Sequence, residues 1–393
     1  GDPQDSSLDL TSAAMELERL LDRILRQTTG APVGLVAVGP EQWGVEQLTP
    51  GWYDGTTGVA VALAAAGLAL KHPAATDRAR ELLTRELTST TNLASRWWRS
   101  RGPGGQDGVG GMLFGWAMAS RLLPDLEAPV GKAVARMLAQ RVEPQPAADL
   151  LSGSLGLVAG LVAARGAGIP VDQGIAQAIV ATTETAVREY LTQRGVNGFS
   201  HGNSGMAAVL DAAGVAGWAS DESLVTRCLD AESRRFDTAL GDWHDLRRGP
   251  DAGPGPGWCN GAAGLALARL LCGDPTKDLP RLRPLVTRDV QARDNLCCGS
   301  TGRAEILRIW MTVDPTMKAT YEACVNGVIE RVNADRLRLG VPEGLPIQPI
   351  GLFQGLAGPV ITLAAAMAPQ LPAVLAWGHP TGEPSAAVLP SGR

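Results

Sequence analysis

The sequence has few residues that could form disulfide cross-links, direct export or bind a polyanion. Six cysteines in 393 residues are far too few for a disulfide scaffold. A net charge of −5, with no cluster of lysine and arginine, leaves no basic surface for nucleic acid or a membrane. The longest apolar run, Val59–Leu70, is too short to span a bilayer.

The N-terminal residues Gly1–Asp5 also lack the basic and apolar regions of a signal peptide. Without an export signal, the cysteines are expected to be free or metal-bound thiols rather than disulfides. We therefore predict a cytoplasmic protein with no membrane span and no nucleic-acid partner.

Glycine, by contrast, recurs in a repeated motif. Seven copies of Gly-x-x-Gly open short apolar stretches, and longer charged segments with helical periodicity lie between them. Repetition at this spacing is typical of repeat architectures. Glycine lets loops and helix starts approach closely, and positive φ costs it little. The first glycines of the seven motifs are Gly55, Gly108, Gly153, Gly202, Gly261, Gly299 and Gly355.

The alternation predicts two kinds of helix, because a helix that is apolar on all sides is a buried one. Amphipathic outer helices are expected at Leu8–Gln27, Thr76–Ser95, Pro129–Arg141, Val171–Arg194, Glu222–Leu240, Leu279–Ala292 and Met317–Leu337. Buried inner helices are expected at Val59–Leu70, Met112–Leu123, Leu157–Arg165, Met206–Trp218, Leu265–Cys272, Ala304–Val313 and Pro359–Pro369.

Fourteen helices in this order indicate an all-α fold, an α/α toroid with seven outer and seven inner helices in concentric rings. Each glycine loop has the same phase in its repeat, so all should face one end of a central opening. We expect a single domain over residues 1–378 and a flexible tail over 379–393. Val33–Val38 is one weak strand candidate.

Three of the cysteines stand just before glycine motifs. Cys259 precedes Gly261, and Cys297 and Cys298 precede Gly299 in the next repeat. Three thiols on neighbouring loops form a plausible zinc site, and a catalytic zinc keeps its fourth position open. The alternative is cysteine as a small buried apolar residue. That interpretation is favoured for the cysteines inside helical patterns, which are Cys228, Cys272 and Cys324.

His201, directly before Gly202, falls on the same rim and is a candidate general acid or base. Asp149 lies four residues before Gly153 and could cap a helix or serve as a base, whereas capping is favoured for Asp54. The remaining histidines are expected to be solvated (His72 and His379) or to hold a loop (His244).

These motifs, Trp258-Cys259-Asn260-Gly261, Cys297-Cys298-Gly299 and Ser200-His201-Gly202, resemble the lanthionine synthetase C-like family over roughly Trp52–Ala366. Tyr53-Asp54-Gly55 and Asp149–Gly153 resemble the cyclase domains of class II lanthipeptide synthetases. Two departures stand out. Cys298 replaces the histidine of many members, as in a subgroup of class II enzymes, and Asn260 replaces a common aromatic or histidine.

The resemblance implies an α/α toroid with Zn²⁺ at its mouth. By motif, Cys259, Cys297 and Cys298 match the zinc ligands. His201 matches the acid/base histidine and Asp149 the active-site aspartate. Such enzymes add a peptide cysteine thiol to dehydroalanine or dehydrobutyrine and so close lanthionine or methyllanthionine rings.

The implied partner is a dehydrated precursor peptide. The chain has no kinase-like motif, so dehydration is expected from another domain or protein. Two alternatives stay open: a non-catalytic, zinc-stabilised peptide-binding scaffold, and addition of a small thiol such as glutathione to dehydrated residues. Zinc prenyltransferases and toroidal glycosidases are less favoured, because the former use a Cys/His/Asp ligand set and the latter need paired carboxylates.

Overall fold

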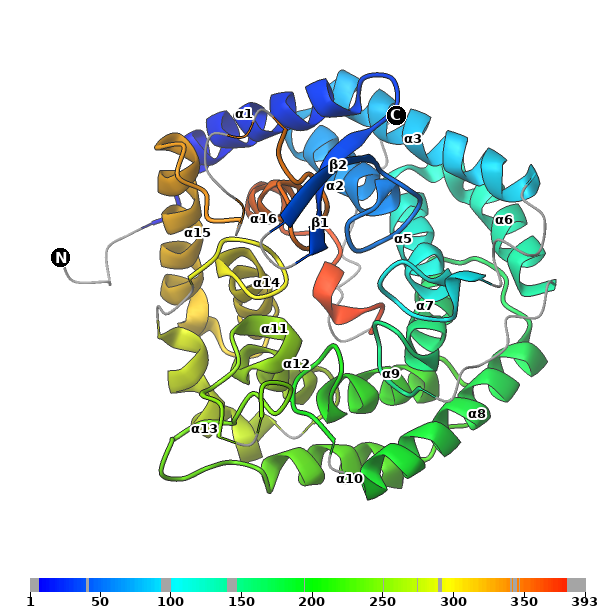
Figure 1. Ribbon diagram of the computed structural model, residues 1–393, viewed down its shortest axis with the longest axis vertical. Coiled ribbons are helices and arrows are strands. Elements are labelled where there is room, and N and C mark those ends of the chain that lie inside the picture. Colours follow the sequence, from blue (N-terminus) through cyan, green and yellow to red (C-terminus); the bar gives the residue numbers. More distant parts are fainter. Residues whose placement is uncertain are drawn as a thin grey trace.

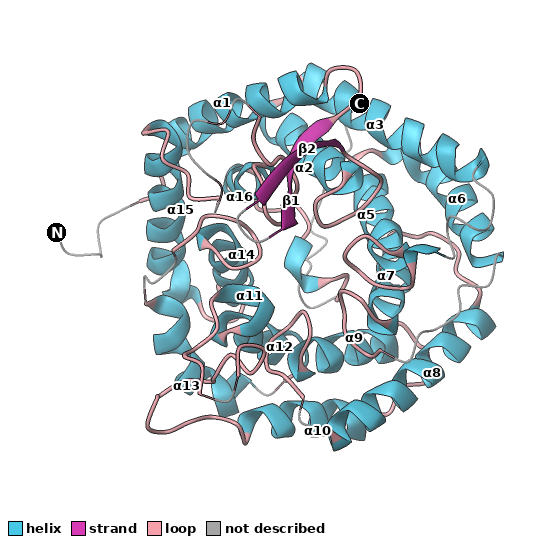
Figure 2. Ribbon diagram, in the orientation of Figure 1, coloured by secondary structure: helices cyan, strands magenta, loops and turns pink. Residues whose placement is uncertain are grey.

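The computed structural model describes residues 7–39, 42–92, 100–139, 147–193, 195–249, 251–273, 275–288, 292–339, 341, 345 and 347–379. Within these ranges the chain winds once around a closed double ring of helices (Figures 1 and 2). The predicted α/α toroid is therefore confirmed. In the described parts of the chain, no helix is both long enough and apolar enough to cross a membrane.

The inner ring consists of helices whose side chains are buried almost throughout. Consecutive inner helices contact one another, and the last packs against the first, which closes the ring. In α2, for example, every residue from Thr56 to Gly67 is buried, as expected for a helix surrounded by others. The inner helices are α2 (Thr56–Leu70), α5 (Val109–Leu122), α7 (Ser154–Gly166), α9 (Asn203–Val215), α12 (Ala262–Cys272), α14 (Ser300–Trp310) and α16 (Ala357–Met367).

The outer helices bury one stripe against the inner ring. In α1 that stripe includes Leu17, Leu20, Leu21 and Ile24, all fully buried. Each outer helix packs mainly on one inner helix: α3, α6, α8, α10, α13 and α15 each pack on the inner helix that precedes them, and α1 packs on α16. The outer helices are α1 (Leu10–Thr28), α3 (Pro73–Asn92), α6 (Glu127–Ala139), α8 (Gln173–Thr192), α10 (Glu222–Ser233), α13 (Pro275–Thr287) and α15 (Lys318–Asn333).

The inner helices begin earlier than predicted, which changes the role of the motif. Six of them start directly after the first glycine, so the second glycine lies inside the first turn. A Cβ added at Gly58 would lie 2.2 Å from the carbonyl oxygen of Trp52, and one at Gly205 would lie 1.9 Å from that of Phe199. The first glycines have extended backbone, so close packing of loop on helix, rather than positive φ, requires the motif.

α10 falls furthest short of its predicted end, and α13 and α15 also end early, at Thr287 instead of Ala292 and at Asn333 instead of Leu337. α10 ends at Ser233 instead of continuing to Leu240. The Asp237 carboxylate accepts the backbone N–H groups of Ala239 and Leu240 (2.7 and 3.0 Å), and such local bonds compete with the helical ladder.

A two-stranded antiparallel hairpin interrupts the helical pattern near the N-terminus. β1 (Val33–Gly39) confirms the weak strand candidate, and β2 (Gln42–Gln47) was not predicted because its sequence shows no clear alternation. Figure 1 shows this hairpin reaching inward from the outer wall across the ring.

The central opening is filled by the chain after α16. The short helix η3 (Val374–Ala376) lies in the middle of the ring, where the buried Trp377 ring packs 4.7 Å from Phe114 and 6.4 Å from Trp52 (Figure 1). The prediction of a solvated His379 is wrong: its side chain is buried, and its Nε2 lies 2.9 Å from the Asp211 carboxylate. Residues 380–393 of the predicted tail lie outside the described residues.

Candidate functional site

The seven glycine loops meet at one end of the toroid and are joined by backbone hydrogen bonds. The N–H of Tyr53 donates to the carbonyl of Gln106 (3.0 Å), and Gln106 donates to Leu151 (3.0 Å). On the other side, Phe353 donates to Tyr53 (2.9 Å) and Cys297 donates to Phe353 (3.2 Å). Each of these residues stands two positions before the first glycine of its motif. The repeat therefore brings the side chains one or two positions before each first glycine to a common rim.

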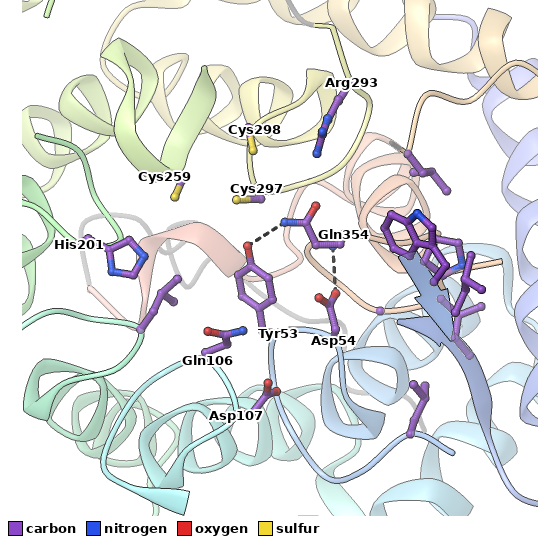
Figure 3. Close-up of a pocket in the computed structure, with 18 of the residues that line it drawn as sticks. Tyr53, Asp54, Gln106, Asp107, His201, Cys259, Arg293, Cys297, Cys298 and Gln354 are labelled. Atoms are coloured by element: carbon purple, nitrogen blue, oxygen red, sulfur yellow. Dashed lines mark hydrogen bonds between the residues drawn. The ribbon is translucent and has the colours of Figure 1, made fainter. Parts of the chain in front are cut away.

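This rim surrounds a cavity of about 690 Å³ (Figure 3). Every one of the seven loops contributes to its wall, and side chains of the β1–β2 hairpin complete it on one side. The polar and thiol-bearing residues of the wall are Tyr53, Asp54, Gln106, Asp107, His201, Arg247, Cys259, Arg293, Cys297, Cys298 and Gln354.

The three predicted cysteines are brought together here. Cys297 lies between the other two and hydrogen-bonds to both Cys259 and Cys298. The hydrogen bond from Cys297 lowers the pKa of Cys259 to about 6 against the effect of burial, and it also lowers the pKa of Cys298. By the same contacts, the pKa of Cys297 is raised well above its ordinary value.

The two cysteine loops touch because of Gly257. This residue has φ of +71°, and a Cβ on it would lie 2.6 Å from the Cα of Cys298. Only glycine adopts such a backbone at little cost, and only glycine leaves room for the neighbouring loop. Gly257 opens the short helix α11 (Gly257–Asn260), which carries Cys259.

Two polar groups approach the Cys259 sulfur in addition to Cys297. The Ser200 hydroxyl lies 2.8 Å from Sγ, and the Arg247 guanidinium donates to Sγ across 3.2 Å. Arg247 carries a positive charge that favours a thiolate at Cys259. In Figure 3, Arg293 lies next to Cys298, on the side of the thiol cluster away from Cys259.

His201 and Asp149 form a pair on the neighbouring loops. Nδ1 of His201 lies 3.3 Å from Oδ1 of Asp149, and the imidazole points into the cavity (Figure 3). The Asp149 carboxylate also accepts the backbone N–H and hydroxyl of Ser152, and so it shapes the loop before α7. Burial acts to raise the pKa of Asp149, but the hydrogen bonds from His201 and Ser152 outweigh it and keep that pKa below its ordinary value.

The three remaining cysteines lie in helices, as predicted. Cys228 is buried in α10, away from the cavity, and burial raises its pKa to about 12. Burial raises the pKa of Cys272, in α12, still further, and Cys324 is buried in α15. His244 holds a loop through Asp237 (2.8 Å) and the carbonyl of Ala252 (2.6 Å). None of the six cysteines forms a disulfide.

Several cavity residues were not predicted from the sequence, and Asp54 does not have the helix-capping role expected for it. Asp54 does not cap α2; its Oδ1 accepts the backbone N–H of Gln354 (3.0 Å) and so joins the first and last repeats. Burial raises the pKa of Asp54 to about 7. Gln354 also donates to the Tyr53 hydroxyl (3.1 Å). The signal for these residues was their position one or two places before a glycine motif, whereas no sequence signal pointed to Arg247.

The three thiols are suitable zinc ligands, but they are not arranged as a complete coordination site. Within the described ranges, no three His, Cys, Asp or Glu side chains are arranged so that they could already hold a metal ion. Three neighbouring sulfurs, with Cys297 in contact with the other two, nevertheless match the soft-ligand preference of zinc. The donor set therefore fits the ion in chemical kind, and coordination would require the side chains to turn toward a common point.

Fold and site together define a seven-repeat α/α toroid with a thiol-lined cavity at one end. The sequence profile described as "Lanthionine synthetase C-like protein" matches residues 46–377. The chain therefore belongs to the lanthionine synthetase C-like family. Among solved structures, "Nisin cyclase" is similar with a TM-score of 0.57 and 15% identity, over 90% of this chain and 93% of that one. No curated protein matched the chain.

Proposed function

We propose that this protein is a zinc-dependent lanthipeptide cyclase, which adds cysteine thiols of a dehydrated precursor peptide to dehydroalanine or dehydrobutyrine. Family membership and fold support lanthionine cyclase activity. The observation that carries the proposal is the cluster of Cys259, Cys297 and Cys298 in the cavity that also contains His201. We further propose that the reaction takes place in the cytoplasm, on a peptide dehydrated by another domain or protein.

Cys259, Cys297 and Cys298 are the residues that would hold the zinc ion. When bound, zinc supplies a positive charge that lets a substrate thiol lose its proton near neutral pH, where a free thiol with pKa of about 8.5 is mostly protonated. Arg247 stands beside Cys259 and offsets part of the negative charge that three thiolates bring to the cavity wall.

His201 is the proposed proton donor. The substrate sulfur forms a bond to the β-carbon of the dehydro residue, and the electron pair of the double bond moves to the α-carbon as an enolate. That carbon then takes a proton. Nδ1 of His201 faces Asp149 at 3.3 Å, so Nε2 is the nitrogen available to deliver it. The thiol proton lost and the α-carbon proton gained balance, and the peptide mass is unchanged.

Asp149 is a positioning residue in this scheme. Its carboxylate faces Nδ1 of His201 and so orients the imidazole with Nε2 toward the cavity. The Tyr190 hydroxyl donates to the backbone carbonyl of His201 (3.0 Å) and fixes the loop from α8. General acid help of this kind contributes about 10²–10⁴-fold to rate.

The test is to incubate the full chain and Zn²⁺ with a synthetic peptide that contains one cysteine and one dehydroalanine. Loss of the alkylatable thiol at constant mass is the expected result, with Cys259→Ala inactive and Cys228→Ala, a buried cysteine outside the cavity, active. Binding without ring closure would instead support a peptide-binding scaffold. A mass increase in the presence of glutathione, without ring closure, would support intermolecular thiol addition.

A further inference from the structure

The hairpin beside the cavity has one edge whose backbone groups point outward. The N–H of Leu48 donates to the carbonyl of Pro32 (2.9 Å), which makes Pro32 and Leu48 a hydrogen-bonded pair. Such pairs alternate along an antiparallel ladder, so Gly34–Glu46 and Val36–Gly44 are the next ones in the register. The backbone groups of the intervening β2 residues Trp43, Val45 and Gln47 therefore point away from β1.

The other edge of the hairpin agrees with this assignment and is already used. Leu35 pairs with Val45 in the register, and the N–H of Leu35 donates outward to the carbonyl of Gln348 (3.4 Å). For Trp43, Val45 and Gln47, no backbone partner is found among the described residues on the outer side of β2. These three residues span about 13 Å of strand, enough to pair with about five residues of an extended chain.

The free edge is continuous with the reaction cavity. Leu35, Trp43 and Leu48 all line that cavity, and the hairpin stands along one side of it in Figure 3. Val45 shares a face of the hairpin with Trp43, and its side chain is 55% exposed. A strand added beside β2 would thus run along an apolar surface that ends at the cavity.

We infer that β2 is the docking strand for the substrate peptide, which pairs in extended form with the backbone of Trp43, Val45 and Gln47. This inference rests on the proposed function for the identity of the peptide. An unpaired strand edge can pair with a further strand. The main-chain hydrogen bonds form with the backbone of the added strand, whatever its sequence. Trp43 and Val45 contact alternate side chains of the added strand. The docked segment tethers the cysteine and the dehydro residue next to the thiols.

The test uses two synthetic peptides that contain one cysteine and one dehydroalanine. The short peptide contains only the ring-forming segment with blocked ends, and the long peptide extends it by eight residues at each end. Val45→Pro removes one outward N–H, and Val45→Thr keeps that N–H while changing the side chain. Losing one peptide hydrogen bond corresponds to roughly a three- to tenfold change in binding.

For the wild type, KM should be lower for the long peptide than for the short one. Val45→Pro should reduce this advantage by roughly three- to tenfold with no change in kcat, and Val45→Thr should retain it. Hydrogen exchange should slow at Trp43, Val45 and Gln47 when the long peptide binds. An advantage that survives Val45→Pro, or unchanged exchange at these amides, would overturn the docking role.

Two controls keep the outcomes separate. If Val45→Pro does not fold, as judged by circular dichroism, Gln47→Pro removes another outward N–H nearer the end of the strand. If the wild type closes no ring in either peptide, the proposed function fails, and exchange protection by the long peptide still decides whether β2 docks it.

Discussion

Replacing Gly257 with alanine should disturb a point where the backbones of the two cysteine-bearing loops touch. Gly257 has φ of +71°, and the Cβ of an alanine would lie 2.6 Å from the Cα and 3.0 Å from the carbonyl carbon of Cys298. Both neighbouring atoms are backbone, so no side-chain rotation relieves the contact. The loops that carry Cys259 and Cys298 must separate.

The size of the effect follows from two contributions. A left-handed backbone costs a residue with a Cβ about 1–2 kcal/mol relative to glycine. Forcing an extra carbon into a packed site costs about 1–3 kcal/mol more. We therefore expect Gly257→Ala to lower the free energy of unfolding by about 2–5 kcal/mol. Relief of the contact moves the loops apart by about 1 Å, since carbon atoms prefer about 3.5–4.0 Å.

Gly241→Ala is the matched control, because Gly241 has φ of +67° and no atom within 4 Å of its added Cβ. It should lose only the backbone contribution of about 1–2 kcal/mol. Urea unfolding followed by circular dichroism measures both variants without metal, and competition with a chelator measures zinc affinity. Gly257→Ala should bind zinc at least about tenfold more weakly, as for other changes that misplace metal ligands, and Gly241→Ala should bind it normally. Equal stability losses and equal zinc affinity in the two variants would refute the reasoning.

Three further substitutions test other parts of the account. Burial raises the pKa of Asp54 to about 7, so the folded state holds a proton that the unfolded state has lost, and stability should fall as pH rises from about 4 to 7. Asp54→Asn should remove this contribution, so its stability, measured by urea unfolding at several pH values, should fall less than that of the wild type between about pH 4 and 7; an identical pH dependence in the two proteins would contradict it. Arg269→Met leaves the buried Glu232 without its ion pair (2.9 Å) and should cost about 3–5 kcal/mol, against at most about 1 for the exposed Arg188→Met. Glu232 also accepts the N–H of Gly198 (2.8 Å), in the loop before His201, so activity should fall too. Cys298→His makes the proposed zinc site less negative and should slow cyclisation at saturating zinc; a faster rate would count against three thiolates as the activating set.

The hydrophobic periodicity of the sequence predicted the ring of helices, because the local sequence of each inner helix already shows that the helix is buried. Stretches such as Thr56–Leu70 are apolar on all sides, and that pattern needs no knowledge of tertiary contacts. The exact helix starts could not be predicted, because they depend on how closely the carbonyl of Trp52 approaches Gly58. β2 was also missed, since Gln42–Gln47 contains only two apolar residues, Trp43 and Val45.

The site residues that could be predicted from the sequence are those near the glycine motifs. Cys259, Cys297 and His201 stand one or two residues before a glycine, and the shared register carries them to one rim. Arg247 comes from the loop between α10 and α11, and its contact with Cys259 depends on tertiary folding alone. The same is true of Trp377, which fills the ring from a segment without repeat periodicity.

The most direct measurement is X-ray absorption at the zinc edge of the purified full chain, with the metal content determined in parallel. One zinc per chain, with three sulfur neighbours at about 2.3 Å and one lighter ligand, is the result expected if Cys259, Cys297 and Cys298 hold the ion and leave a position for substrate. A chain without zinc, or a zinc with four sulfur or histidine ligands from the protein, would contradict the account.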